Sequence, residues 1–113
     1  MTRGDLYWVE FPGGAGHAQA GRRPAIIVQG DQAIAKLPTI LVIPCTTQQD
    51  ALRFPGTVLL EPDANNGLRQ PSVALVFQLT SLDKRFLGSR IGRLTDEKLT
   101  ALWEALDQIM ERP

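Results

Sequence analysis

The segment GHAQAGRRPAIIV (Gly16–Val28) contains two adjacent arginines and a proline directly before an apolar run. The run is short and continuously apolar, which predicts a strand over Ala25–Gln29 that is buried on both faces. Pro24 disfavours helical backbone at the residue before it, so Arg23 is expected to be extended at the start of this strand. The segment therefore predicts a buried strand with guanidinium groups at its entrance.

Four further segments have the composition of short strands and are bounded by Gly, Pro and Asn turn signals. They are Leu6–Phe11, Thr39–Cys45, Thr57–Leu60 and Ser72–Leu79. A short helical turn is expected over Ser81–Phe86. Short strands at these intervals predict a mainly β fold, either a small curled sheet or a barrel.

The end of the sequence has a different period. After Thr95, apolar residues recur at the three- and four-residue spacing of one helical face. Thr95 is the expected N-cap, and Asp96 and Glu97 place negative charge at the positive end of the helix dipole. We expect an amphipathic helix that packs on the sheet or contributes to a subunit contact. The apolar positions are Leu99, Leu102, Trp103, Leu106, Ile109 and Met110.

Length and charge limit the classes of protein to consider. The 113 residues suit a single domain spanning residues 1–113, and 43% of them are hydrophobic. Twelve basic residues balance twelve acidic ones, which argues against a strongly basic nucleic-acid coat. Nine of the twelve cations are arginine, a bias that suits forked hydrogen bonding to phosphate or carboxylate.

The only cysteine, Cys45, cannot form an internal disulfide, and a small buried thiol in a reducing compartment is expected. Met1 leads directly into polar residues, without the layout of a signal peptide. No apolar run approaches the roughly 20 residues that would span a bilayer. These features predict a cytoplasmic protein without membrane contact.

Two segments concentrate side chains that could perform chemistry. An extended Arg23, with Arg22 beside it, could offer two parallel N–H donors to a phosphate, or could pair with a surface carboxylate. The only histidine, His17, could transfer a proton near neutral pH or remain a solvated loop residue. The stretch PCTTQQ (Pro44–Gln49) places threonines and glutamines at a strand end, where they could bind phosphate oxygens or base edges. The alternative is a turn in which threonine hydroxyls satisfy backbone groups.

Other reaction classes lack the residues they need. No cluster of His, Cys and carboxylate has metal-ligand spacing, so neither a metal nor another cofactor is expected. A hydrolase triad has no GxSxG segment to support it. The glycines at 13, 14 and 16 are not followed by the Lys-Ser/Thr of a nucleotide-binding loop.

Four segments resemble, in order, the motifs of the MazF/PemK family of toxin endoribonucleases. They are RGDLYWVEF (Arg3–Phe11), GRRPAIIV (Gly21–Val28), PCTTQ (Pro44–Gln48) and SVALVFQLTSLDKRFLGSRIGRLTDEKL (Ser72–Leu99). The resemblance implies an SH3-like β-barrel of about five to seven strands with a C-terminal helix, usually homodimeric. It also implies metal-independent, sequence-specific cleavage of single-stranded RNA, and neutralisation by a co-encoded antitoxin whose C-terminal segment occupies the RNA groove.

The resemblance also implies residue roles. The family's catalytic arginine falls on Arg23 and its catalytic threonine on Thr46, and a loop histidine used by some members falls on His17. The family's RNA-contacting positions fall on Gln19, Thr47, Gln48 and Gln78, and Arg22 is a further candidate RNA contact beside Arg23. The 2′-hydroxyl of the RNA would attack the adjacent phosphorus, leaving a 2′,3′-cyclic phosphate and a 5′-hydroxyl.

The sequence departs from the family at three positions. Leu75 and Phe77 stand where some members have an arginine and an aspartate, and Ala18 stands where many have an acidic residue. The missing acidic residues leave open a catalytically degenerate module that binds RNA or antitoxin. A CcdB-like gyrase poison, which has the same barrel and acts through the end of the C-terminal helix, is a second alternative. The chain ends Met110-Glu111-Arg112-Pro113, without the apolar terminus that a gyrase contact would favour.

Overall fold

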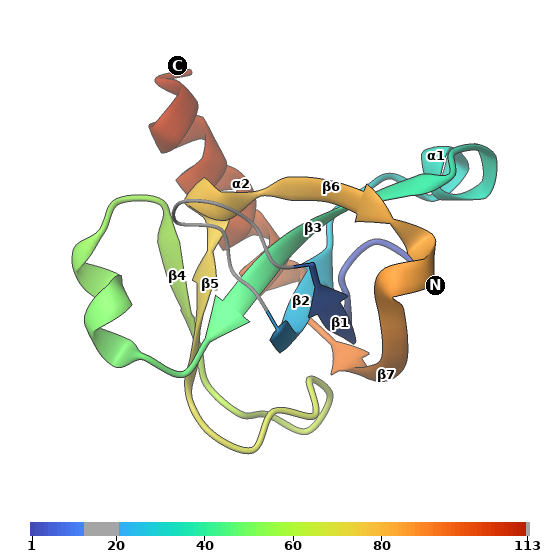
Figure 1. Ribbon diagram of the computed structural model, residues 1–113. Coiled ribbons are helices and arrows are strands. Elements are labelled where there is room, and N and C mark those ends of the chain that lie inside the picture. The colour runs from blue at the N-terminus through green and yellow to red at the C-terminus, as the bar shows by residue number, and fades with distance from the viewer. Residues whose placement is uncertain (13–20, 113) are drawn as a thin grey trace.

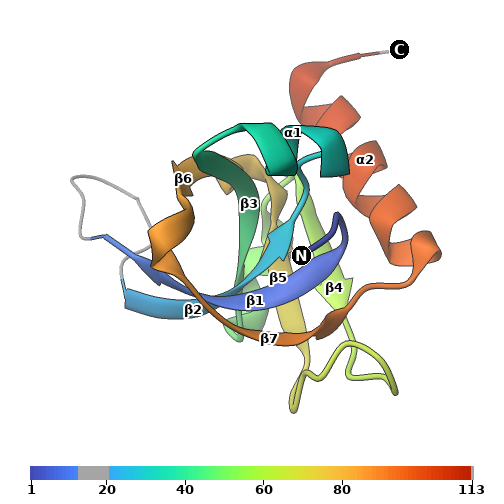
Figure 2. The ribbon, with the colours of Figure 1, turned by 90° about the vertical axis from the view of Figure 1, so that its right-hand side faces the viewer.

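The computed structural model describes residues 1–12 and 21–112. Antiparallel strands make up one seven-stranded sheet, ordered β4-β5-β3-β2-β1-β7, with β6 paired to β3. The sheet curls into a barrel-like body, with a C-terminal helix along one side (Figures 1 and 2). The strands are β1 (Asp5–Phe11), β2 (Gly21–Ile27), β3 (Thr39–Thr46), β4 (Thr57–Leu60), β5 (Ser72–Leu75), β6 (Thr80–Asp83) and β7 (Leu87–Arg93). The predicted mainly β fold with a C-terminal helix is confirmed.

Strand β3 connects the parts of the sheet because it pairs with three other strands. Its first half pairs with β6, and Val42–Pro44 pairs with β2 up to the pair Ala25↔Pro44. Its last two residues, Cys45 and Thr46, pair with β5 instead. The end of β3 and the first half of β2 therefore diverge, which decides where the functional site lies.

The last three residues of β2, Ala25–Ile27, are buried on both faces of the sheet, as the apolar run predicts. Because side chains alternate along a strand, Ile26 joins one core cluster while Ala25 and Ile27 join the other. The first cluster lies against the C-terminal helix and includes Leu102, which is fully buried. The two clusters hold β2 rigidly within the sheet.

The C-terminal helix α2 (Asp96–Met110) begins where the sequence predicts. The Thr95 Oγ1 atom accepts a hydrogen bond from the backbone N–H of Lys98 at 3.2 Å, as an N-cap does. Leu99, Leu102 and Ala105 are its buried residues, and the helix packs mainly against β4 and the 3-10 turn η2 (Val76–Gln78).

Several boundaries differ from the predictions. The strand predicted over Ala25–Gln29 spans Gly21–Ile27 instead, so its predicted last two residues are wrong. Arg22 and Arg23 lie inside the strand, where pairing with β1 supplies the hydrogen bonds. The predicted strand over Ser72–Leu79 is wrong after Leu75, where the chain turns into η2. The predicted helical turn over Ser81–Phe86 is wrong in its first half, which belongs to β6; only η3 (Lys84–Phe86) is helical.

Three elements have no clear signal in the sequence. Helix α1 (Asp31–Lys36) and the 3-10 helix η1 (Gln49–Arg53) are too short to show a helical period. Strand β7 contains two glycines and three polar or charged residues, and it forms because β1 offers it a pairing edge.

Candidate active site

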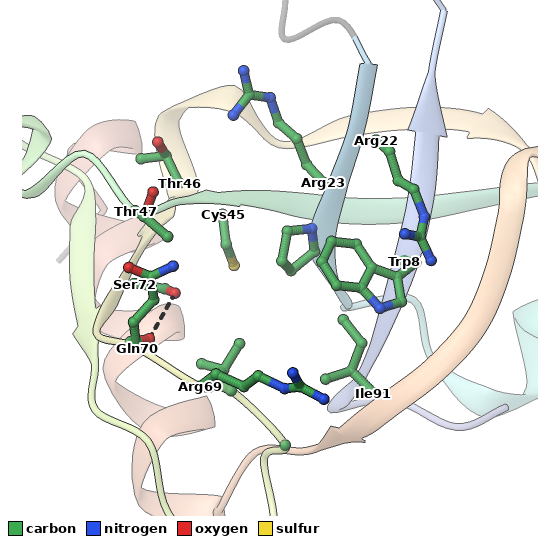
Figure 3. Close-up of a pocket in the computed structure, with 13 residues that line it drawn as sticks. Trp8, Arg22, Arg23, Cys45, Thr46, Thr47, Arg69, Gln70, Ser72 and Ile91 are labelled. Carbon is green, nitrogen blue, oxygen red and sulfur yellow. Dashed lines mark hydrogen bonds between the residues drawn. The ribbon is translucent and has the colours of Figure 1, made fainter.

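A pocket of about 580 Å³ lies where β2 and β3 diverge (Figure 3). Residues from β1, β2, the end of β3, the loop before β5, the start of β5 and β7 line it. They are Trp8, Arg22, Arg23, Pro24, Cys45, Thr46, Thr47, Gly67, Leu68, Arg69, Gln70, Ser72 and Ile91. Three arginines and two threonines contribute hydrogen-bond donors, and no aspartate or glutamate is among these lining residues.

Two prolines stand at the point where the β2–β3 ladder ends. Pro44 pairs with Ala25, and Pro24 lies next to that pair, opposite Trp8 of β1. A proline has no N–H to donate to a ladder, so prolines in sheets occur at edges and irregularities. The prolines therefore mark the end of this ladder, beyond which β2 and β3 separate and the pocket opens.

Arg23 is held firmly but has an unused donor. Its backbone pairs with Val9, a fully buried residue, and its side chain is half-buried. The Nε atom is buried and has no hydrogen-bond partner within residues 1–12 and 21–112. In Figure 3 the guanidinium group extends toward the side of the pocket formed by Thr46. Leaving a buried donor unsatisfied costs about 1–3 kcal/mol, a cost that an anionic ligand would remove.

Thr46 is the last residue of β3 and is buried at the pocket wall. Its Oγ1 atom accepts a hydrogen bond from the backbone N–H of Gln48 at 3.2 Å. The turn considered as an alternative for this segment, in which a threonine hydroxyl satisfies a backbone group, is thus present. Because that bond uses an oxygen lone pair, the hydroxyl hydrogen remains available for a second acceptor.

Trp8, Arg22 and Cys45 also line the pocket. The guanidinium carbon of Arg22 lies 4.3 Å from the centroid of the Trp8 ring, a cation–π contact that orients both groups. Burial raises the pKa of the Cys45 thiol to about 12. Cys45 is therefore a neutral, packed thiol at physiological pH, as the sequence predicts, and it does not act as a nucleophile.

Within residues 1–12 and 21–112, no three His, Cys, Asp or Glu side chains lie close enough together to hold a metal ion. None of the helices in those ranges is long and apolar enough to cross a membrane.

The family model for PemK-like, MazF-like toxins of type II toxin–antitoxin systems matches residues 2–110. The chain belongs to this family. It is 35% identical over 106 residues to the protein named Probable endoribonuclease MazF5 of Mycobacterium tuberculosis, covering 94% of this chain and 89% of that one. It is 34% identical over 107 residues to Endoribonuclease EndoA of Bacillus subtilis, covering 94% and 90%. The crystal structure of MazE–MazF from Deinococcus radiodurans matches with a TM-score of 0.77 and 25% identity, covering all of this chain and 97% of that one.

In this MazF-like toxin, the pocket brings together four of the predicted site residues: Arg22, Arg23, Thr46 and Thr47. Gln48 is exposed beyond the end of β3, and Gln78 lies in η2; neither lines the pocket. His17 and Gln19 lie outside the described residues.

Sequence reasoning missed Trp8, Arg69, Gln70 and Ser72 as pocket residues. The segment around Trp8 predicts only a strand, and Arg69 follows a turn signal without any local pattern of its own. The arginine bias of the composition was the one available hint, and it does not say which arginines converge.

Proposed function

We propose that this MazF-like toxin is an endoribonuclease that cleaves single-stranded RNA at short sequences without a metal ion. The observation that carries the proposal is that Arg23 and Thr46 line the same pocket. The buried Nε atom of Arg23 lacks a hydrogen-bond partner among the described residues. Two curated relatives that carry the name endoribonuclease support it.

RNA supplies its own nucleophile in this reaction. The 2′-oxygen forms a bond to the adjacent phosphorus, the bond from phosphorus to the 5′-oxygen breaks, and a 2′,3′-cyclic phosphate and a 5′-hydroxyl result. The 2′-hydroxyl loses its proton to a base, and the leaving 5′-oxygen gains one. The protein must therefore align the phosphate, stabilise a phosphorane with added negative charge, and move these protons.

Arg23 is suited to bind the phosphorane. Its backbone is fixed between β1 and the Pro24 irregularity, so its guanidinium group needs little rearrangement as charge develops. One preorganised donor of this kind contributes roughly 3–4 kcal/mol, or 10²–10³ in rate. The same group is the proposed proton donor to the leaving 5′-oxygen.

Thr46 is suited to hold a non-bridging phosphate oxygen. Its rotamer is set by the hydrogen bond from the Gln48 N–H, which directs the hydroxyl hydrogen elsewhere. Arg22 and Thr47, on the same pocket, are proposed RNA contacts, and Gln48 and Gln78 are proposed contacts beyond it. Gln19, which lies outside the described residues, is also a proposed RNA contact. His17 is the proposed general base.

The biological setting follows from the family. We infer that residues 1–113 act as one toxin domain in the cytoplasm, as a homodimer that a cognate antitoxin neutralises by occupying the RNA groove. The family description, a toxin of a type II toxin–antitoxin system, and the MazE–MazF match support this setting.

The test is incubation of the protein with single-stranded RNA in EDTA, followed by sequencing of the new 5′ ends. Cleavage that leaves 5′-hydroxyl and cyclic-phosphate ends is expected. Arg23→Ala should lower the rate by at least about 10², whereas Arg112→Ala, which removes an exposed arginine at the far end of α2, should not. Parent-rate cleavage by Arg23→Ala would contradict the role of Arg23.

The same assay separates the other functions. His17→Ala should slow cleavage by 10²–10⁴; a loss below about tenfold, or roughly 1.4 kcal/mol, would remove His17 from the general-base role. Intact RNA together with inhibited DNA gyrase would indicate a CcdB-like poison. RNA that is bound but never cut would indicate a degenerate binding module.

A further inference from the structure

The nine arginines of the chain differ in whether a carboxylate pairs with them. Five form ion pairs with carboxylates, and a sixth lies over an aromatic ring. These are Arg53 with Asp50, Arg85 with Asp83, Arg90 and Arg93 with Asp5, Arg112 with Asp107, and Arg3 over Trp103. Four arginines have no ion-paired carboxylate in the described ranges. One of them, Arg3, lies away from the pocket lining, whereas the other three, Arg22 (which lies over Trp8), Arg23 and Arg69, all line the pocket.

This division indicates an anionic ligand larger than one phosphate. The chain has twelve acidic residues for its twelve basic ones, yet none of the acidic residues lines the pocket. Residues 13–20 contain no Asp or Glu either. Three uncompensated positive charges around one cavity attract negative charge. Arg23 and Thr46 account for one phosphate, which leaves Arg69 on the loop side of the pocket without a role.

The loop that carries Arg69 is built around a buried asparagine. Asn66 is 2% exposed; its Nδ2 donates to the Glu61 carbonyl (2.8 Å), and its Oδ1 accepts from the N–H groups of Asp63 (3.2 Å) and Leu68 (2.9 Å). The Asp63 carboxylate in turn accepts from the N–H groups of residues 65 and 66. Hydrogen bonds within the loop therefore hold its backbone in place up to Leu68, the residue before Arg69.

The loop also packs closely against the backbone of β7. Gly67 has a φ of +70°, and a Cβ atom there would lie 2.2 Å from the Ile91 carbonyl oxygen. A Cβ atom at Gly92 would lie 2.4 Å from backbone atoms of residues 65 and 66. On the other side of Arg69, the Gln49 Nε2 donates to the Pro71 carbonyl at 3.0 Å. The backbone on both sides of Arg69 is thus fixed before any ligand binds.

Figure 3 shows Arg69 extending along the side of the pocket opposite Arg23 and Thr46, toward Ile91. The cavity of about 580 Å³ is within the range of about 300–1,000 Å³ typical of sites that enclose a small-molecule ligand. We propose that Arg69 binds a second phosphate of the RNA strand, so that the pocket encloses one nucleotide between Arg69 and the Arg23–Thr46 pair. This inference rests on the proposed function, because it takes the ligand to be RNA.

The test compares Arg69→Gln with Arg112→Gln, which removes the same charge from the end of α2. The ligand is an RNA oligonucleotide that contains the mapped cleavage site and a 2′-O-methyl group at the scissile nucleotide, which prevents attack. Fluorescence anisotropy at several potassium chloride concentrations gives Kd and its salt dependence. Arg69→Gln should raise Kd about tenfold and lower the slope of log K against log salt by about 0.7, the value for one phosphate on a single strand. Arg112→Gln should change neither.

A scan of the oligonucleotide with single neutral methylphosphonates locates the second phosphate. One substitution other than at the scissile phosphate should weaken binding to the parent protein about tenfold and leave binding to Arg69→Gln unchanged. In cleavage assays, Arg69→Gln should raise KM while kcat changes less than about threefold, since the contact is present before and during the reaction.

The outcomes separate this inference from the proposed function. If the parent protein cuts RNA and Arg69→Gln matches it in Kd, salt slope and methylphosphonate pattern, Arg69 does not bind phosphate and the nuclease proposal stands. If the parent protein cuts no RNA, so that no cleavage site can be mapped, the nuclease proposal fails. The comparison of Kd values, made with a single-stranded RNA oligonucleotide that the parent binds, still decides the role of Arg69. No RNA binding by the parent protein overturns both.

Discussion

Asn66→Ala tests whether one buried side chain organises the loop that forms one wall of the pocket. The asparagine makes three side-chain hydrogen bonds, one donated to the Glu61 carbonyl and two accepted from the N–H groups of Asp63 and Leu68. Alanine keeps the backbone bonds of residue 66 and removes all three. We expect a loss of fold stability together with weaker RNA binding.

The magnitude follows from the number of bonds. A typical intramolecular hydrogen bond contributes about 1 kcal/mol net, so three lost bonds cost about 3 kcal/mol. The backbone groups that lose their partners, the Glu61 carbonyl and the N–H groups of Asp63 and Leu68, make part-buried hydrogen bonds. Water cannot replace all three bonds, so the cost stays near about 3 kcal/mol. For a chain of this length, that lowers Tm by roughly 10 °C.

The assay is thermal and urea unfolding at one fixed protein concentration, with Asn65→Ala as the matched control. Asn65 is exposed, and only its backbone takes part in hydrogen bonds of the loop. The control should stay within about 0.5 kcal/mol of the parent. Equal stabilities for the two alanine variants would refute the view that Asn66 organises the loop. Wild-type RNA affinity in a destabilised Asn66→Ala protein would show that loop order does not matter for binding.

Three other outcomes are expected. In a Trp103→Phe protein, Trp8 is the remaining tryptophan, and binding of 2′-O-methyl RNA should change its emission because it lines the pocket; unchanged emission at saturation would place the RNA elsewhere. Cys45, with its pKa raised to about 12 by burial, should resist a disulfide reagent at pH 8 in the native protein and react in denaturant; rapid native reaction would contradict its burial. Because the pKa of the folded-state thiol is raised, the neutral Cys45 thiol contributes fully to the free energy of unfolding below pH 9.0, the ordinary pKa of a cysteine. That contribution is lost as the pH rises from 9.0 toward 12, so urea midpoints should fall over that range. Thr95→Ala should lower unfolding free energy by about 1 kcal/mol through loss of the bond from the Lys98 N–H, and no change in the urea midpoint would show that the cap is dispensable.

Much of the fold is encoded in short stretches of sequence. The apolar run after Pro24 marks a strand buried on both faces, and Thr95 followed by a three- and four-residue apolar period marks the last helix. Both signals are local, since side-chain alternation, helical period and capping depend only on residues within a few positions of each other. The order of motifs also indicated the family, and with it the pair Arg23 and Thr46.

The tertiary structure decided which residues share the pocket. Strand β7 depends on the pairing edge of β1, and the pocket exists because β3 changes partner from β2 to β5 after the pair Ala25↔Pro44. Arg69 reaches the pocket because a loop folded around Asn66 packs on the backbone of β7. These contacts join residues far apart in the chain, and strand register and loop packing, which no local pattern encodes, determine them.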